Sequence, residues 1–309
     1  MISFFTIPKP FKGHISIIQR NAILSWRQLN PDCEIILYGD EEGVKEIADE
    51  FGLIYVPDIK KNENGTPFLD FVFNDAQSKA KNNVLCYVNT DIIFFKDFID
   101  SVQHLTKDPF LAVGLRWELD VPCTICYSDD SWENNLRTMV EKNGNEGGNL
   151  SIDYFVFSKT AQLRLLPFLV GREGWDNWII FHARKEGVIV VDISQTTKAI
   201  HQNHKYNHIP FKKGEKWQGP ESDYNMNLLG DKIVQKSRIN MWNIDDTEYS
   251  LTSSGLVQKQ NGIYKKVMKK IILLCPDRLF PIIGLFILTI VRPIVIIRNA
   301  VGRQAHWFL

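Results

Sequence analysis

Short apolar runs alternate with amphipathic stretches along the first part of the chain. The apolar runs have strand length, whereas the stretches between them repeat their apolar positions every three or four residues. Strands alternating with helices predict βαβ units, and therefore an α/β fold with a mostly parallel, Rossmann-type sheet flanked by helices. The expected strands are residues 2–7, 34–38, 53–56 and 84–88, and the expected helices are residues 15–29, 41–51 and 68–81.

The same alternation continues less regularly after residue 98. Strands are expected at residues 111–114, 152–157 and 188–192, and helices at residues 98–105 and 176–187. Residues 116–146 lack clear periodicity, which predicts an irregular, substrate-facing insertion.

Composition adds a charge asymmetry to this picture. A chain of 309 residues with 44% hydrophobic and 23% charged residues can bury a full core. Its net charge is zero, yet residues 263–309 are strongly basic and residues 1–262 are acidic, which suggests a body and a separate tail. The acidic body argues against nucleic-acid binding, and the tail favours an anionic partner. The charged residues of the tail are Lys265, Lys266, Lys269, Lys270, Arg278, Arg292, Arg298 and Arg303, with Asp277 as the one acid.

The tail is also apolar, with an uncharged run over residues 279–291 that contains Pro281 and Gly284. A membrane-spanning helix needs about 20 apolar residues, so this run is short. We therefore expect the tail to lie in the interface of an anionic membrane rather than cross it. The alternative is a C-terminal helix that packs on the protein's own core.

The N-terminus begins directly with the strand-like residues 2–7, without a basic and apolar leader. This predicts a cytoplasmic protein that is peripheral on the inner face of a membrane. Of the five cysteines, only Cys123 and Cys126 form a C-x-x-C motif, and no second pair accompanies it. We expect reduced structural thiols rather than a zinc or redox centre.

The apolar strand at residues 84–88 runs into Asn89-Thr-Asp91. Ligands gather at the carboxyl ends of parallel strands, and two positions separated by one residue point the same way on an extended chain. A carboxylate and an amide oxygen suit Mn²⁺ or Mg²⁺ carrying a diphosphate. Asp91 is therefore the first candidate metal ligand and Asn89 the second. The alternative is that Asp91 only ends the strand and caps a turn.

Asp176 lies at an expected helix start between Trp175 and Trp178. Two indoles offer a flat surface for a sugar ring, and burial could raise the pKa of the carboxyl. Such a carboxylate can deprotonate a sugar hydroxyl as a general base. The alternative is that Asp176 is only a helix N-cap.

Three histidines, His201, His204 and His208, occur within eight residues after an expected strand. This density favours a metal or phosphate role, with His201 the first candidate and His204 the second. At the ends of the first two strands, Pro8 and Asp40 are candidates for the nucleotide site, and Asp40 could hold a base or ribose hydroxyl. Equally, Asp40 could belong only to a turn. Lys12, Arg20 and Lys79 are expected to be solvated.

The order of these segments resembles that of the nucleotide-sugar-dependent glycosyltransferases of the GT-A fold, over roughly residues 1–210. The resemblance implies that Asn89-Thr-Asp91 replaces the D-x-D motif, that Asp176 is the base, and that His201 supports the metal or diphosphate. It also implies an acceptor loop at Gly147 and Gly148. The segments are Asn64-Gly-Thr-Pro-Phe-Leu69, Asn89-Thr-Asp91, Trp175-Asp-Asn-Trp178 and Ala199-Ile-His-Gln-Asn-His204.

The resulting hypothesis is a metal-dependent glycosyltransferase that uses Mn²⁺ or Mg²⁺, a nucleotide-sugar donor and a glycan or lipid-linked acceptor. Inversion follows if Asp176 is the base. A nucleotidyltransferase is one rival, although that class usually carries a glycine-rich basic loop where this chain has Pro8-Lys-Pro-Phe-Lys-Gly13. Other rivals are a metal hydrolase built on the three histidines and a catalytically silent carbohydrate-binding protein.

Overall fold

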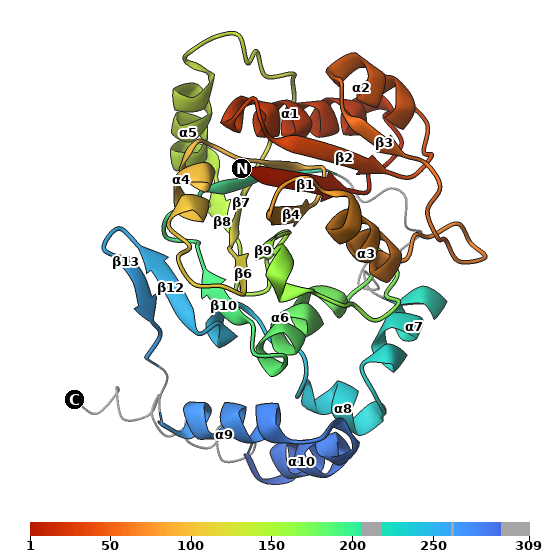
Figure 1. The fold of residues 1–309 in the computed structure, drawn as a ribbon, viewed down its shortest axis with the longest axis vertical. Helices are drawn as coiled ribbons and strands as arrows, with labels where there is room; N and C mark the ends of the chain where they lie inside the picture. The colour runs from red at the N-terminus through yellow and green to blue at the C-terminus, as the bar shows by residue number, and fades with distance from the viewer. Residues whose placement is uncertain (205–217, 261–262, 292–309) are drawn as a thin grey trace.

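The computed structural model describes residues 1–204, 218–260 and 263–291 (Figure 1). Within these ranges, the main sheet has nine strands in the order β13-β12-β10-β6-β9-β4-β1-β2-β3. Strand β9 is antiparallel to both of its neighbours and β13 is antiparallel to β12, whereas the other pairs are parallel. The predicted α/β fold with a mostly parallel sheet is confirmed. The strands are β1 (Ile2–Thr6), β2 (Glu34–Tyr38), β3 (Ile54–Val56), β4 (Val84–Val88), β6 (Phe110–Val113), β9 (Tyr154–Ser158), β10 (Ile189–Asp192), β12 (Tyr249–Thr252) and β13 (Gly255–Gln258).

Helices cover both faces of this sheet (Figure 1). Successive residues of β1 contact helices on opposite faces of the sheet. The ring of Phe4 stacks on Trp26 of one helix, at 5.6 Å between ring centroids, and the ring of Phe5 packs against Phe73 of another, at 5.1 Å. Successive strand residues point to opposite faces, so each face has its own core. Residues of α1 (Gly13–Leu29), α2 (Val44–Phe51) and α4 (Asp97–Gln103) pack in one core, and those of α3 (Leu69–Lys79) and α6 (Trp175–Lys185) in the other.

A second sheet has the strand order β5-β11-β7-β8. Its strands are β5 (Ile92–Ile93), β11 (Ala199–Gln202), β7 (Arg116–Leu119) and β8 (Asn145–Glu146). The expectation of an irregular segment at residues 116–146 was wrong, because it contains β7, the helix α5 (Trp132–Asn143) and β8. The helical periodicity of this segment is weak in the sequence because α5 buries only Leu136 and Val140, which form a narrow apolar stripe on an otherwise polar helix.

The chain after residue 218 adds short elements beside α6. They are α7 (Pro220–Leu228), α8 (Lys232–Ser237), α9 (Ile263–Leu274) and α10 (Phe280–Phe286), with the short helices η2 (Ile244–Asp246), η3 (Asp277–Leu279) and η4 (Ile287–Val291); η1 (Lys159–Ala161) lies earlier. The described part of the tail packs on the body through buried Ile272, Cys275 and Phe280. The division at residue 262 stays a prediction.

Among the described residues, no single helix is long and apolar enough to cross a membrane. The segments Lys266–Leu274 and Asp277–Val291 meet the length and composition criteria together, but they are bent by 119° at the break between them. The predicted basic positions Arg292, Arg298 and Arg303 lie outside the described residues.

Candidate active site

The second sheet brings the histidine segment to the carboxyl end of β4. Strand β11 pairs with β5 so that His201 lies opposite Ile92, the residue after Asp91. The backbone N–H of Gln202 donates to the carbonyl of Asp91 at 3.1 Å. This register places Nε2 of His201 3.7 Å and Nε2 of His204 3.0 Å from Oδ2 of Asp91. The third predicted histidine, His208, lies outside the described residues.

The three side chains are buried, with 14% of Asp91, 6% of His201 and 2% of His204 exposed. Burial raises the pKa of Asp91, but His201, His204 and Lys9 outweigh it and hold this pKa well below its ordinary value. Burial lowers the pKa of His201, although the charge of Asp91 opposes the shift. The arrangement therefore favours an ionised carboxylate beside a neutral imidazole, the forms in which both groups bind metals.

A divalent metal fits this cluster. Its ligand atoms lie within 4.8 Å of one another, and it is the one group of three or more potential ligands found among His, Cys, Asp and Glu of the described residues. Within the described part of the chain, Oδ1 of Asp91 and Nδ1 of His201 are buried without a hydrogen-bond partner. Buried polar atoms are normally satisfied, so two such atoms in one cluster are consistent with a bound cation. One carboxylate and two imidazoles suit Mn²⁺ and also softer metals such as Zn²⁺.

Asn89 lies beside this cluster and has a partner that the sequence did not suggest. Its Nδ2 donates to Oδ1 of Asp153 at 2.9 Å, and the other oxygen of Asp153 pairs with Arg116. Arg116 also lies 3.1 Å from a carboxylate oxygen of Glu118. An asparagine side chain binds cations through its oxygen, and the bond from Nδ2 to Asp153 leaves Oδ1 of Asn89 as the atom that can act as a ligand. Its metal role stays a prediction.

Lys9 is a residue of the site that sequence reasoning missed. Its backbone is fixed after β1, since its N–H donates to Oε1 of Gln19 at 2.7 Å and its carbonyl accepts from Nε2 of Gln19 at 2.8 Å. Burial lowers the pKa of Lys9, and the nearby charge of Asp91 raises it. The sequence pattern that could have indicated Lys9 is its position next to Pro8, just beyond the end of the first strand.

Asp40 is exposed and pairs with Lys61, which holds the pKa of this carboxyl below its ordinary value. It follows β2, at the edge where the nucleotide was predicted, and the nucleotide roles of Pro8 and Asp40 stay predictions. The three cations judged to be solvated all have exposed or partly exposed carboxylate partners: Lys12 with Glu42, Arg20 with Glu50 and Lys79 with Asp75.

Asp176 is the second residue of α6, and Gly174 rather than Asp176 is the N-cap. The N-cap alternative was therefore wrong. The Asp176 carboxylate accepts from the N–H of Asn177 at 2.9 Å. Burial raises the pKa of Asp176 to about 6, with nearby backbone N–H groups opposing the shift. A carboxyl with this pKa can act as a base near neutral pH.

The two tryptophans do not form the open stacking surface that was expected. Trp175 is 7% exposed and packs in the core at 5.3 Å from Tyr87 and 4.9 Å from Phe155, between ring centroids. Burial, and after it the charge of Asp91, raises the pKa of Tyr87, whose ring packs against Trp175 at the start of α6. The first turn of α6 turns its indoles inward because they belong to its apolar stripe.

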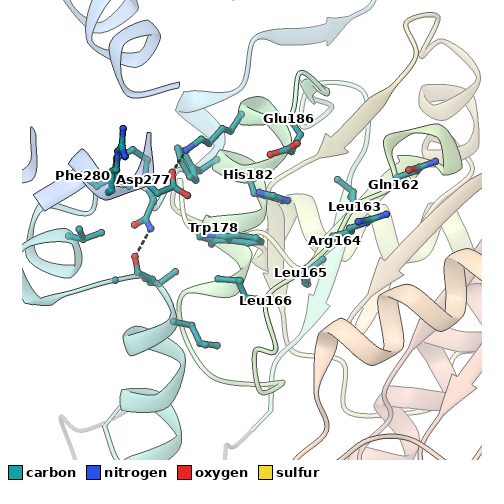
Figure 2. A pocket seen from close by; sticks show the side chains of 18 of the residues that line it. Gln162, Leu163, Arg164, Leu165, Leu166, Trp178, His182, Glu186, Asp277 and Phe280 are labelled. Atoms are coloured by element: carbon teal, nitrogen blue, oxygen red, sulfur yellow. Dashed lines mark hydrogen bonds and ion pairs between the residues drawn. The ribbon is translucent and has the colours of Figure 1, made fainter. Parts of the chain in front are cut away.

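Trp178 instead lines a cavity of about 890 Å³ between α6, α8 and the tail (Figure 2). Its ring stacks on His182 at 4.3 Å with an interplanar angle of 12°. Figure 2 shows both rings on α6, with Asp277 and Phe280 of the tail across the cavity. An acceptor role for Trp175 or Trp178 stays a prediction.

Gly147 is needed for a close approach of its loop to β7. Its N–H donates to the carbonyl of Arg116 at 2.9 Å, and a Cβ there would lie 2.6 Å from Oγ of Ser151. Gly148 has open space around it. The next residue, Asn149, donates to Asp245 at 3.0 Å, and Asn177 of α6 donates to the carbonyl of nearby Trp242 at 2.9 Å. Residues 242–245 therefore join the glycine loop to α6.

All five cysteines are free, and both Cys123 and Cys126 are exposed. The carbonyl of Cys123 accepts from Asn21 at 3.0 Å, and Asn21 also donates to Gln202 at 3.0 Å. The backbone of the C-x-x-C loop thus contacts Asn21, which also binds the histidine segment, and the role of the two thiols stays a prediction.

No protein-family model and no curated protein sequence matches the chain. Several solved structures are similar to it. S. aureus TarS in complex with UDP-GlcNAc has a TM-score of 0.47 and 11% identity, over 76% of this chain and 67% of that chain. Glucosyl-3-phosphoglycerate synthase from Mycobacterium tuberculosis with Mn²⁺, UDP and phosphoglyceric acid has a TM-score of 0.42 and 15% identity, over 67% and 72%. GalNAc-T7 with UDP, GalNAc and Mn²⁺ has a TM-score of 0.48 and 14% identity, over 95% and 57%.

The chain spans 60% of another S. aureus TarS structure. At identities of 15% or less and TM-scores below 0.5, this likeness carries no argument about the activity, so we derive the function from the side chains of the site.

Proposed function

We propose that this protein is a metal-dependent glycosyltransferase that uses a nucleoside diphosphate sugar. The observation that carries the proposal is the cluster of Asp91, His201 and His204 at the carboxyl end of β4, in which two buried polar atoms have no hydrogen-bond partner among the described residues. Open α/β sheets bind their ligands at this edge. The position thus suits a diphosphate held through a cation.

Each nearby group has a role that its environment supports. Asp91, His201 and His204 would hold the divalent cation, Mn²⁺ or Mg²⁺, and this cation would supply positive charge to the diphosphate leaving group. Lys9, close enough to Asp91 to affect its pKa, adds positive charge at the same edge. Asp176 takes the proton of the acceptor hydroxyl, because its raised pKa suits a base near neutral pH. Attack by an acceptor activated in this way displaces the diphosphate directly, with inversion.

A metal hydrolase is the second candidate, because two histidines and one carboxylate also form catalytic zinc sites. Two further acids are already paired: Asp153 with Asn89 and Arg116, and Glu118 with Arg116. This pairing disfavours a second base beside the metal. A preference for Zn²⁺ with hydrolysis of phosphoesters would support the hydrolase over the transferase.

Calorimetry with UDP, with and without Mn²⁺, tests the donor site. We expect UDP to bind tightly only with the metal in wild-type protein and in Asp32→Asn, a control at an exposed aspartate. Incubation with nucleotide sugars and Mn²⁺ should then release UDP, through slow hydrolysis where no acceptor is present. Equal UDP affinity with Mn²⁺ and with chelator would contradict the metal assignment. Tight donor binding without transfer or hydrolysis, across a panel of acceptors, would instead identify a carbohydrate-binding protein.

A further inference from the structure

The described part of the tail exposes a row of large apolar side chains. We define the outer face of the tail as these exposed residues of α9, η3, α10 and η4. The helices α9 and α10 lie at one end of the molecule, opposite to α1 and α2 (Figure 1). The outer face consists of Val267, Ile271, Leu274, Leu279, Ile282, Leu285, Phe286 and Ile290, which are between 40% and 75% exposed.

The opposite face of the tail is fixed to the body. Lys269 is buried and lies 2.8 Å from a carboxylate oxygen of Asp246. Phe280 packs against Phe181 of α6 at 5.8 Å between ring centroids. Gly284 approaches α8 so closely that a Cβ would lie 2.8 Å from Oγ of Ser237. The tail is therefore anchored through its inner face while its outer face stays exposed.

Helical spacing arranges the outer face of α9 in two stripes. Val267, Ile271 and Leu274 are three or four residues apart and form an apolar stripe. Lys266 and Lys270, both exposed, are four residues apart and flank it. An apolar stripe bordered by lysines is the pattern of a helix that lies in a membrane interface.

The charge of the described tail is one-sided. Arg278 is exposed like the two lysines, and Asp277, the one acid of the tail, is also exposed but pairs with Lys185 of α6. Exposed basic residues around apolar side chains complement anionic headgroups above an acyl layer. A protein partner would need acidic groups around a matching apolar surface, whereas an anionic membrane provides both features everywhere.

We propose that the outer face of the tail docks in the interface of an anionic lipid membrane, without crossing it. Crossing is disfavoured because the two segments are bent by 119° and their inner sides are packed on the body. This inference goes beyond the proposed function and does not depend on it. A position on the cytoplasmic face of the membrane is part of the same proposal.

Docking in this way would hold the candidate site near the membrane. The helix α6 carries Asp176 in its first turn, and its second half contacts the tail through Phe181 and Lys185. Eleven helical residues extend about 16 Å. Under the proposed function, a lipid-linked acceptor would lie within reach of Asp176.

Flotation of the full-length protein with lipid vesicles tests the proposal. We expect binding to vesicles that contain phosphatidylglycerol, weaker binding to phosphatidylcholine alone, and loss of the difference at high salt. The double substitution Ile282→Glu and Leu285→Glu should weaken binding by about tenfold or more, since it removes buried apolar groups from the interface. Ile54→Glu is the matched control, because Ile54 is an exposed apolar residue on the edge strand β3, 42% exposed.

The control measurements separate docking from folding and from self-association. Circular dichroism and UDP binding with Mn²⁺ should be equal for the double variant and the wild type. Lys266→Gln with Lys270→Gln should reduce the preference for anionic vesicles, whereas binding to neutral ones should change little. Full-length protein that ignores phosphatidylglycerol vesicles at low salt would overturn the proposal. So would sedimentation showing that the double substitution only converts a dimer to a monomer while flotation is unchanged.

Discussion

Nε2 of His204 lies 3.0 Å from Oδ2 of Asp91, although 113 residues separate them in the chain. The contact depends on the pairing of β11 with β5, which brings the histidine segment alongside the end of β4. The candidate metal centre is thus assembled from two segments that belong to different parts of the sequence.

Asp91→Asn should abolish metal-dependent binding of UDP while the fold survives. The amide cannot supply the negative charge that the cation needs, although it keeps the shape of the carboxylate. Loss of a second-shell partner costs about 10- to 100-fold in metal affinity, so loss of a ligand should cost at least about 100-fold. Calorimetry of Mn²⁺ and UDP binding measures this effect. An unchanged affinity in a folded variant would exclude Asp91 as a ligand.

Asn89→Asp should destabilise the metal-free protein. The added carboxylate would replace an amide whose nitrogen lies 2.9 Å from Oδ1 of Asp153, so a hydrogen bond becomes a like-charge contact. This contact also gives a physical reason for asparagine at this position. Adding Asp153→Asn should recover stability, with a coupling energy of ~1–3 kcal/mol in a double-mutant cycle. Urea denaturation in the presence of chelator measures the cycle, and additive effects would show that the two side chains do not interact.

Asp176→Asn should lower the transfer rate by ~10²- to 10⁴-fold with little change in donor affinity. Because the pKa of Asp176 is raised to about 6, the base is ionised above that pH. The wild-type rate should therefore rise with pH up to about 6 and then level off, provided that no other group titrates there. The variant should lack this rise. A variant with the wild-type pH profile would leave Asp176 a structural role only.

Stability measurements on the same variant check that its loss of rate is not caused by unfolding. The pKa of Asp176 is higher in the folded state than the ordinary 3.8, so its ionisation opposes folding as pH rises through about 6. Asparagine avoids that cost. We expect Asp176→Asn to be more stable than wild type at pH 8, by up to about 3 kcal/mol, and to lose this advantage near pH 4.

Glu221→Gln should destabilise the protein at neutral pH. Burial raises the pKa of Glu221, but hydrogen bonds from Asn62, Thr66 and Arg172 lower it to about 2. A lowered pKa means that the ionised group stabilises the fold above about pH 4.5 and that this contribution is lost as pH falls toward 2. The expected loss at pH 7 is ~2–3 kcal/mol.

Urea denaturation at pH 7 and at pH 3 measures this effect, with Glu63→Gln as the control at an exposed residue of the loop that carries Asn62 and Thr66. The difference between Glu221→Gln and wild type should shrink at pH 3. A difference that is equal at both pH values would mean that lost packing, not lost charge, causes the destabilisation.

The local pattern of the chain determined the elements of the first half of the fold. The apolar runs gave β1, β2 and β4 within a residue of their observed ends, because burial on both faces of a parallel sheet selects continuous apolar strands. The same logic located Asn89 and Asp91 at the end of a strand. The environment of Asp176 was also foreseen, since a carboxyl between two indoles at a helix start is readily desolvated.

Tertiary structure alone decided which polar atoms meet. The partner of Asn89 is Asp153, and the partners of Asp91 are His201 and His204, none of which periodicity can identify. Trp175 was expected to face a sugar, but it fills the core beside Tyr87. Periodicity records which side of an element is buried, whereas register and packing between distant segments determine what lies against that side. The end of β4, which the sequence predicts, locates the candidate site. The pairing of β11 with β5, which only the tertiary structure shows, brings the histidines to Asp91.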